Sequence, residues 1–520
     1  MTSLNIALNA QRREADLNFA STNTVDVLVV GLGVTGAGAA LDAAARGLSV
    51  VAIDAHDMAW GTSRWSSKLV HGGLRYLAKA QFDVAYESAV ERGILMSRTA
   101  PHLTRPVPML LPLAPPVTAM QSSLAGIGFI AGDVLRRTAH TPTSVLPSPR
   151  FISAHRTASL APALRQQALR GGLLAWDGQL EDDARLVIGL ARTAAALNAR
   201  ILTHTKATAI TGEGATVTDT RTGETLHISA RTVINATGVW ASNLVPEVRL
   251  KPSRGTHIVV RSHTLGNPTA ALTVPVPGET NRFVFALPQP DGLTYIGLTD
   301  EPTHGDVPDI PLPAETEIDF LLSTMNRVIE QPLTRSDVVG AFAGLRPLLD
   351  SDGHTADLSR RHAVITSRNG VITVVGGKLT TYRTMAADAI DHAVKYAHLD
   401  AGPCLTANLP LLGAAPRRTL RGLNAPARLV RRYGREANLV LNNPVLGTAS
   451  QDPALHTPIS ETIPTTMAEM IFGITHEGAL TIDDLLDRRT RIGLVPTDRR
   501  IAEQAALEAF KLVELLPVQA

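Results

Sequence analysis

The sequence predicts an α/β protein in three parts: a lobe on a parallel sheet, a lobe on an antiparallel sheet, and a helical C-terminal domain. Strand-like and helix-like segments alternate over residues 25–400, which is the pattern of βαβ units. The chain of 520 residues is also longer than one ordinary core accommodates. Beyond about residue 409 the helical period dominates, so we expect a separate domain there.

The expected boundaries follow these changes of pattern. Residues 1–24 form an N-terminal extension, residues 25–400 hold two interleaved lobes, and residues 401–520 form the helical domain. The second lobe takes roughly residues 106–170 and 255–340 and carries a small antiparallel sheet. The expected strands are 25–30, 48–53, 200–205, 256–261, 282–286, 294–298 and 370–375, and the expected helices are 37–46, 119–135, 182–198, 465–472 and 498–515.

Composition excludes several classes of protein. With 49 basic and 47 acidic residues the formal net charge is +2, so no nucleic-acid partner is expected, because such a partner requires a strongly basic face. The single cysteine, Cys404, rules out an intramolecular disulfide and a CxxC pair, and no metal site is predicted. One cysteine suits a reducing cytoplasm, and residues 1–24 lack the apolar core of a signal peptide.

One stretch, residues 106–132, has no charged side chain and is long enough to resemble a membrane span. Prolines interrupt its first half, however, and a spanning helix needs about 20 apolar, helix-compatible residues. Residues 119–135 instead predict an amphipathic helix that could lie on a membrane surface. An ordinary buried helix is the alternative, and the sequence leaves both open.

A glycine-rich turn follows the first predicted strand. Gly31, Gly33 and Gly36 form a GxGxxG pattern between residues 25–30 and the next helix. In a dinucleotide site such glycines allow a tight turn, close approach of the pyrophosphate, and close packing of helix on strand. Asp54 ends the second strand, near the offset of about 20 residues expected for the carboxylate that binds a ribose hydroxyl. The pattern predicts a dinucleotide site and leaves FAD and NAD open.

A second segment of unusual composition occupies residues 62–77. It combines hydroxyls, cations and paired glycines, which suits backbone passing close to a polar cofactor, although a structural turn is the alternative. Further motifs follow along the chain: DDARLV at 182–187, NATGVW at 235–240, GLRPL at 344–348, GGKLTTYR at 376–383, THEGAL at 475–480 and RRTR at 488–491.

In order and content, these segments resemble the FAD-dependent glycerol-3-phosphate dehydrogenases, a family of the D-amino-acid-oxidase-like flavoproteins. The resemblance runs from about residue 25 to residue 515. It implies an α/β fold with a Rossmann-like FAD-binding lobe, an antiparallel-sheet substrate lobe and a C-terminal helical domain. The family usually reads Gly-Thr-Thr-Asp where this chain has Gly297-Leu298-Thr299-Asp300, so a polar role at Leu298 is in doubt.

The resemblance implies FAD as the cofactor. Backbone N–H groups at the helix start after Gly377 would stabilise the reduced flavin, with a plain helix cap as the alternative. The residues expected to bind FAD are Gly31, Gly33, Gly36, Asp54, Thr62, Ser63, Ser66, Ser67, Lys68, His71, Gly72, Gly73, Ala207, Thr237, Gly238, Gly377, Lys378, Leu379 and Thr380.

The resemblance also implies oxidation of sn-glycerol 3-phosphate to dihydroxyacetone phosphate by hydride transfer to the flavin. The substrate's phosphate dianion requires converging cations. The residues expected to bind the substrate are Arg75, Tyr76, His257, Arg346, Arg360, Lys378 and Thr380. Each of these cations could equally be a surface residue, and Arg360 could pair with a nearby aspartate.

The expected catalytic residues are His257 and Arg346. His257 lies in a predicted strand and has the side chain best suited to accept a proton near neutral pH. A hydrogen-bonded core histidine is the alternative. Arg346 follows a glycine turn and could share the role by stabilising the alkoxide.

The implied electron acceptor is a membrane quinone, and we expect a cytoplasmic protein that could lie on the inner face of the cell membrane. The uncharged segment 106–132 favours this acceptor. Three alternatives stay open: an oxidase that uses oxygen, an enzyme for a hydroxy or amino acid bound by its carboxylate, and a non-catalytic flavin-binding interaction module. A homodimer is also left open.

Overall fold

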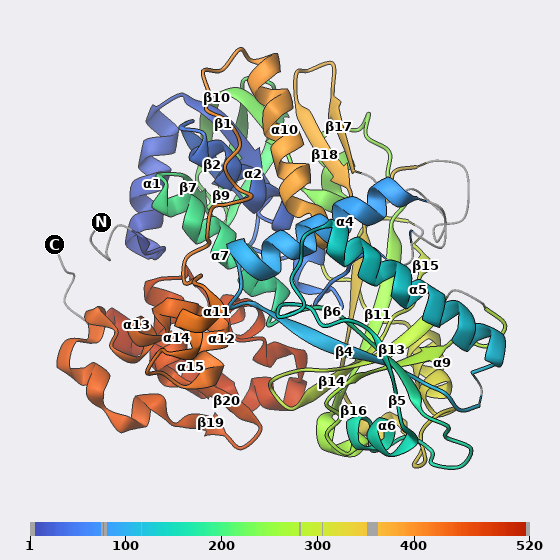
Figure 1. Cartoon of the computed structure of the whole chain (residues 1–520). Helices are drawn as coiled ribbons and strands as arrows, with labels where there is room; N and C mark the ends of the chain where they lie inside the picture. Colours follow the sequence, from blue (N-terminus) through green and yellow to red (C-terminus); the bar gives the residue numbers. More distant parts are fainter. Residues whose placement is uncertain are drawn as a thin grey trace.

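The computed structural model describes residues 6–73, 76, 81–115, 117–279, 282–303, 305–350 and 362–515. Figure 1 shows the parallel sheet in the upper part of the molecule and the second sheet at the lower right. The C-terminal helices lie at the lower left. The predicted α/β fold class is therefore confirmed.

The first sheet is Rossmann-like. At its centre β1 (Val25–Val30) lies parallel to β2 (Val50–Ile53) on one side and to β10 (Thr225–Asn235) on the other. The sheet continues in parallel through β7 (Arg200–Leu202) beyond β2 and β18 (Ile372–Gly376) beyond β10. Antiparallel strands complete it: β8 (Thr205–Thr211), β9 (Gly214–Asp219) and β17 (His362–Thr366).

Helices cover both faces of this sheet, which is why its central strands are apolar throughout. Alternate residues of β1 enter different apolar clusters: Val27 and Val29 belong to the cluster on one face of the sheet, and Leu28 and Val30 belong to the cluster on the other face. The helices on the first face are α2 (Val34–Ala45), α7 (Asp183–Ala196) and α10 (Tyr382–Tyr396), and the helix on the second is α1 (Ala10–Thr22).

The second sheet is larger than the small antiparallel sheet that the sequence predicts. Among the described residues it has ten strands, and one pair, β4 with β12, is parallel. It includes residues 69–70, 172–180 and 338–346, which lie outside the expected ranges, because strand pairing between distant segments leaves no signal in local periodicity. Its strands are β3 (Leu69–Val70), β4 (Thr104–Pro112), β5 (Arg150–Ile152), β6 (Gly172–Leu180), β11 (Ser253–Arg261), β12 (Ala271–Pro275), β13 (Phe283–Pro288), β14 (Leu293–Gly297), β15 (Glu301–Pro302) and β16 (Val338–Arg346).

The amphipathic helix predicted from residue 119 is present as α5 (Ala119–Thr138). Thr118 begins it with a capping box to Gln121. One side of α5 is apolar and exposed in the chain, so the alternative of a buried helix is wrong. The neighbouring α4 (Phe82–Ile94) packs against α5 and also against the segment 379–381 of the first lobe. The second lobe also carries α6 (Ala154–Leu160) and α9 (Glu315–Met325).

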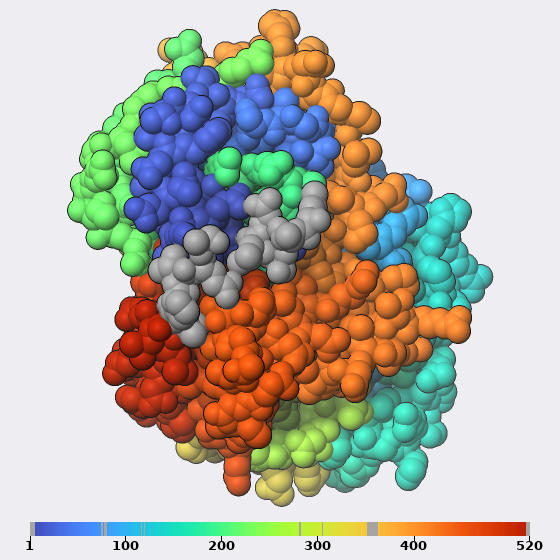
Figure 2. Space-filling model, turned by 90° about the vertical axis from the view of Figure 1, so that its left-hand side faces the viewer, coloured from blue at the N-terminus to red at the C-terminus, as the bar shows by residue number. Residues whose placement is uncertain are grey.

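The C-terminal domain is mainly helical, as predicted, with its own apolar clusters. Its helices are α11 (Arg417–Arg421), α12 (Ala427–Tyr433), α13 (Ala437–Leu441), α14 (Met467–Thr475) and α15 (Pro496–Glu514), and β19 (Pro458–Ser460) pairs with β20 (Ile463–Thr466). Figure 2 shows this domain, in orange and red, against the blue N-terminal part of the chain. Buried ion pairs join this domain to the first lobe, including Arg185 of α7 with Glu477 at 2.6 Å.

None of the described helices combines the length and apolar character that crossing a bilayer requires.

Candidate active site

The turn between β1 and α2 is too tight for a side chain at two of its glycines. Gly31 has a φ of +103°, and a Cβ added there would lie 2.7 Å from the carbonyl oxygen of Ala236. A Cβ on Gly36 would lie 1.8 Å from the carbonyl oxygen of Gly31. Gly33 is the N-cap of α2, so the N–H groups of the first helical turn face the loop. This cradle fits the pyrophosphate of a dinucleotide.

The expected ribose carboxylate lies beside this turn. Asp54 follows β2 and accepts hydrogen bonds from the backbone N–H of Leu32 (2.6 Å) and His56 (2.9 Å). Burial raises the pKa of Asp54 to about 6. Ser63 lies on the other side of the turn, where its hydroxyl oxygen accepts a hydrogen bond from Val34 N–H at 2.9 Å.

The remaining residues expected near the dinucleotide lie at the same edge of the sheet. Ala207 lies on β8, whose first residue, Thr205, donates from its N–H to the Asp54 carbonyl at 2.7 Å. Thr237 and Gly238 follow β10, and the Ala236 N–H donates to the Val30 carbonyl at 2.8 Å. The added Cβ at Gly238 would meet nothing within 4 Å. The loop after β10 therefore leaves open space beside the glycine turn.

We expect Gly36→Ala to remove FAD from the protein. The added methyl group would overlap the Gly31 carbonyl, so the turn must shift, at a cost of about 1–3 kcal/mol for overpacking. The flavin absorbance per protein and the thermal midpoint measure both effects, and both should fall. Gly128→Ala on α5 is the matched control, because its Cβ meets nothing within 4 Å. A Gly36→Ala protein that retains its full flavin content would contradict this account of the turn.

A buried ion pair with the start of α7 holds the segment 62–68 in place. Lys68 and Asp183 are both fully buried, and the Lys68 ammonium lies 2.9 Å from the Asp183 carboxylate. Lys68 also donates to the Arg64 carbonyl at 2.6 Å. Ser66 donates to Asp183 from its N–H (3.0 Å) and its hydroxyl (2.7 Å). Since its ammonium points into this pair, Lys68 can contact a cofactor only through its backbone.

Both ends of the 62–73 segment are attached to strands of the second sheet. At the first end the Thr62 hydroxyl donates to the Leu345 carbonyl at 2.5 Å. At the second end His71 Nδ1 lies 3.3 Å from Asp177 Oδ2, and Gly72 N–H donates to Asp177 Oδ1 at 3.1 Å. Gly73 adopts a φ of +84°, which favours glycine. The segment therefore forms a fixed strip of backbone between the two sheets.

His257 faces this strip from β11. Its Nε2 shares a hydrogen bond of 2.9 Å with the Ser67 hydroxyl, and its ring stacks on Phe342 with a centroid distance of 4.8 Å. Its Nδ1 is buried and has no hydrogen-bond partner within the described chain. Burial, with smaller effects from the Lys68 and Arg346 charges, lowers the pKa of His257 to about 3. His257 is therefore neutral at pH 7 and able to accept a proton.

Arg346 ends β16, the strand beside β11, where it lies opposite Ser253, four residues before His257. Its guanidinium donates to Asp300 (3.0 Å), to the Ser253 hydroxyl (3.1 Å) and to the Thr299 carbonyl (3.3 Å). Its NH2 would lie 2.5 Å from a Cβ added at Gly255, so that glycine leaves room for the guanidinium. These contacts fix a positive charge beside His257.

Lys378 lies after two glycines with positive φ, Gly376 and Gly377, at the start of a helical turn. Its ammonium donates to the Ser88 hydroxyl at 2.5 Å and lies 4.0 Å from the ring centroid of Tyr76. Thr380 is buried, and its hydroxyl accepts a hydrogen bond from His71 N–H at 3.1 Å. Leu379 packs against the core of the first lobe.

The structure brings the predicted residues that it describes to one region. Arg75 and Arg360 lie outside the described residues. A separate cavity, between the second sheet and the C-terminal domain, is lined by residues such as Asp291, Arg432 and Arg491 and includes none of the predicted ones. Within the described residues, no group of three His, Cys, Asp or Glu side chains could hold a metal ion.

Sequence reasoning missed the partners that hold the site. Phe342 stacks on His257, and Asp300 pairs with Arg346. Asp183 belongs to the DDARLV motif at 182–187, but that motif did not predict the ion pair between Asp183 and Lys68. The signal that could have found Asp300 is its position two residues after Leu298, the residue at which this chain differs from the usual family motif.

Two family models match this chain. One, described as FAD dependent oxidoreductase, matches residues 26–383, and the other, described as the C-terminal domain of alpha-glycerophosphate oxidase, matches residues 404–514. Glycerol-3-phosphate dehydrogenase 1 of Mycobacterium tuberculosis is 52% identical and covers 96% of this chain and 98% of its own length. The mitochondrial glycerol-3-phosphate dehydrogenase of Rattus norvegicus is 34% identical and covers 97% of this chain and 72% of its own length.

Solved structures agree with these matches. The glycerol-3-phosphate dehydrogenase of Bacillus halodurans, solved in complex with FAD, has a TM-score of 0.72 at 27% identity and covers 97% of this chain and 96% of its own. An L-alpha-glycerophosphate oxidase of Mycoplasma pneumoniae has a TM-score of 0.56 at 18% identity, covers 75% of this chain and 99% of its own, and so shares the fold alone.

Proposed function

Because the chain belongs to the FAD-dependent oxidoreductases and, among them, to the glycerol-3-phosphate dehydrogenases, we propose that it oxidises sn-glycerol 3-phosphate to dihydroxyacetone phosphate. FAD accepts the hydride when bound. The observation that carries the proposal is that the segments holding His257, Arg346 and Lys378 are all hydrogen-bonded to one strip of backbone, residues 62–73. His257 is bonded to Ser67, Arg346 follows the residue that binds Thr62, and Thr380, two residues after Lys378, is bonded to His71.

In this proposal His257 accepts the proton of the substrate's central hydroxyl. Its ring is held between Ser67 and Phe342, so the accepting nitrogen has a fixed direction. Burial is the main cause of the low pKa of His257, and the Lys68 and Arg346 charges add to it. A phosphate dianion bound nearby would offset the effect of these two charges and would thereby raise the pKa of His257. Arg346 lowers the energy of the developing alkoxide.

Lys378 and Tyr76 offer a cation and a hydroxyl for the phosphate. The Lys378 ammonium lies over the Tyr76 ring, so a cation–π contact holds the two side chains together. Arg75 and Arg360 stay predicted members of the same cradle, outside the described residues. Several converging cations fit a phosphate dianion better than a carboxylate, for which one arginine suffices.

Steady-state assays with an artificial quinone test the substrate class. We expect turnover with glycerol 3-phosphate and less than about 1% of that rate with glycerol or lactate. Neither of these carries a phosphate, whose binding energy would hold the reacting carbon in the correct orientation. Equal turnover of glycerol and glycerol 3-phosphate would contradict the proposed cradle.

We further propose that the chain passes its electrons to a membrane quinone while lying on the inner face of the cell membrane. On α5, the side chains of Met120, Leu124, Ile127, Ile130 and Val134 recur at helical spacing, and each is more than half exposed. Such a face suits an interfacial helix. It lies near the site, since α4 packs on α5 and Ser88 of α4 binds Lys378 (Figure 1).

We expect the double substitution Ile127→Glu with Ile130→Glu to reduce binding to phospholipid vesicles at least about tenfold, because two charges would enter the apolar boundary. Turnover with a membrane-embedded quinone should fall in parallel, while reduction of the bound flavin by substrate stays unchanged. Co-sedimentation with vesicles measures the first effect. Ile501→Glu, on the exposed side of α15, is the control, and should bind vesicles as the wild type does.

The same assays separate the quinone acceptor from oxygen. Hydrogen peroxide formed in stoichiometric amounts with dihydroxyacetone phosphate, and vesicle binding that the α5 substitutions leave unchanged, would favour an oxidase instead. A chain that acts as a quinone-linked dehydrogenase should reduce oxygen far more slowly than quinone.

A further inference from the structure

The ring behind His257 is held in place by the C-terminal domain. Phe342 stacks on His257 with a ring centroid distance of 4.8 Å. The Tyr295 ring meets the Phe342 ring edge-on, with a centroid distance of 5.5 Å. Phe342 and Tyr295 pack in one buried cluster with Leu494, which ends the last helical turn before α15, and with Val495, which follows it. The apolar wall of the reaction site is thus shared between the second sheet and the C-terminal domain.

Arg491, four residues before Val495, is the polar centre of this contact. It is 6% exposed and adopts a φ of +67°, a left-handed conformation that residues other than glycine rarely adopt. Its guanidinium donates to the Tyr295 hydroxyl at 3.1 Å and to the Glu181 carbonyl. Its Nε lies 3.3 Å from the carboxylate of Asp182.

Asp182 and its neighbour Asp183 connect Arg491 to the strip of backbone that carries Ser67. Asp182 caps α7 by accepting a hydrogen bond from the Ala184 N–H at 3.0 Å. Asp183, the first residue of α7, binds Ser66 and Lys68. Two routes therefore lead from Arg491 to His257, one through Tyr295 and Phe342 and one through the start of α7 and the 66–68 backbone.

We propose that Arg491 is a positioning residue for His257, through which the C-terminal domain sets the geometry of the oxidation site. The inference rests on the proposed role of His257 as the proton acceptor. Arg491 touches neither His257 nor the FAD cradle in the described contacts, and acts by fixing the Tyr295 ring and the start of α7. Left-handed backbone at a buried arginine whose guanidinium bonds Tyr295 and Glu181 is the kind of local strain that a functional constraint maintains.

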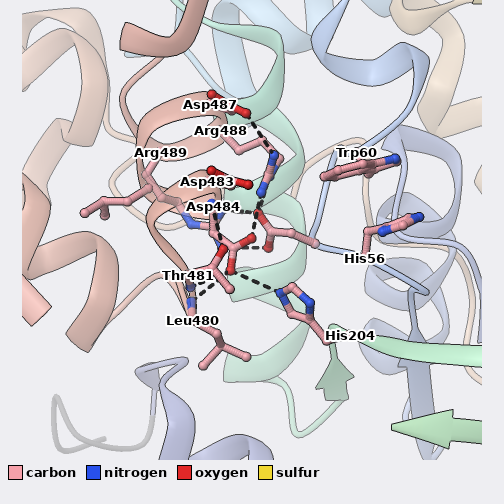
Figure 3. Close-up of polar contacts among 12 residues, drawn as sticks. His56, Trp60, His204, Leu480, Thr481, Asp483, Asp484, Asp487, Arg488 and Arg489 are labelled. Carbon is pink, nitrogen blue, oxygen red and sulfur yellow. Dashed lines mark hydrogen bonds and ion pairs between the residues drawn. The ribbon is translucent and has the colours of Figure 1, made fainter. Parts of the chain in front are cut away.

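A second buried arginine of the same segment provides a matched control. Arg488 is 1% exposed and also joins the C-terminal domain to the first lobe, with bonds of 2.6 Å to Asp57 and to Asp484. Figure 3 shows Arg488 with Asp484 and His204, beside the Trp60 ring. Asp57 keeps Arg489 as a partner if Arg488 is replaced, just as Asp182 keeps Arg432 if Arg491 is replaced.

The test compares Arg491→Met with Arg488→Met as full-length, FAD-loaded enzymes. The rate of anaerobic flavin reduction by saturating glycerol 3-phosphate is measured per bound flavin, together with the half-saturating concentration. We expect Arg491→Met to slow reduction about ten- to a hundredfold, since a shift of about 1 Å at a reacting group costs that much, with half-saturation nearly unchanged. Arg488→Met should lower the thermal midpoint and leave the rate per flavin at the wild-type value.

Tyr295→Phe tests the same inference with a change that leaves the ring in place. It removes the hydroxyl to which Arg491 donates, so reduction should slow several-fold without loss of flavin. This variant decides the matter if Arg491→Met does not fold. A wild-type rate per flavin in Tyr295→Phe and Arg491→Met, or equal losses in Arg491→Met and Arg488→Met, would overturn the inference. Wild-type flavin that glycerol 3-phosphate does not bleach would instead overturn the proposed function, and the role of His257 with it.

Discussion

His257→Gln should slow flavin reduction by glycerol 3-phosphate about 10²- to 10⁴-fold, the range by which a positioned general base contributes. Glutamine is close in size to histidine and can still hydrogen-bond Ser67, but its amide cannot accept the proton of the substrate's hydroxyl. FAD content should stay at the wild-type value, because the glycine turn and Asp54 lie in the other sheet. Stopped-flow absorbance under anaerobic conditions measures the rate.

Two controls separate loss of the base from loss of binding. The half-saturating substrate concentration of His257→Gln should change far less than its rate, since Arg346 and Lys378 remain. A rate within about threefold of the wild type would show that His257 is a core histidine, the alternative that the sequence left open. Solvent would then have to accept the proton, because the Arg346 guanidinium is already protonated and has no acceptor.

Lowering the pH from 6 to 5 should destabilise the folded chain by about 2–3 kcal/mol. Burial lowers the pKa of His102, His257 and His476 to about 3. In the unfolded chain these histidines take up protons near pH 6.5, so below that pH the unfolded state binds more protons than the folded one. Their contribution to stability is therefore complete above pH 6.5 and is lost progressively as the pH falls.

The size follows from linkage. Each such histidine costs about 1.2 kcal/mol between pH 6 and 5, so the three together cost about 3.6 kcal/mol. Asp54, whose pKa is raised to about 6, acts in the opposite direction and offsets about 1 kcal/mol. Urea denaturation with saturating FAD at both pH values gives the difference in the free energy of unfolding.

Substitutions assign this acid sensitivity to particular residues. His102→Gln should lose about 1 kcal/mol less than the wild type over the same interval, because one of the three buried histidines no longer titrates. Replacement of the exposed His155 by glutamine should leave the difference unchanged. Equal stability of the wild type at pH 6 and pH 5 would contradict the burial assigned to these histidines.

Much of the fold was predictable because local signals carry it. The strand 25–30, the glycine turn and the following helix are set by apolar runs and by glycines that leave no room for a Cβ, and both signals are visible in the sequence. The C-terminal helices from residues 465 and 498 follow from helical periodicity and begin within two residues of the expected positions, at Met467 and Pro496. The extent of the second sheet was not predictable, because its pairings join strands more than a hundred residues apart, such as β12 with β4.

The candidate site divides in the same way. Residues within continuous motifs, such as Ser67, Gly72 and Lys378, could be selected from the sequence. The structure places Ser67 and Gly72 on one strip of backbone, and Thr380, two residues after Lys378, is bonded to that strip. Residues that act through tertiary contact could not. Phe342 reads as an ordinary apolar strand residue, and nothing local marks Arg491 as the partner of Tyr295.

Anaerobic titration of the purified protein with glycerol 3-phosphate tests the central claim most directly. We expect the oxidised flavin absorbance to bleach in proportion to the substrate added, with one dihydroxyacetone phosphate formed per flavin, while glycerol and lactate leave the spectrum unchanged. A bound flavin that stays oxidised in the presence of excess glycerol 3-phosphate would contradict the assignment of this site to glycerol 3-phosphate oxidation.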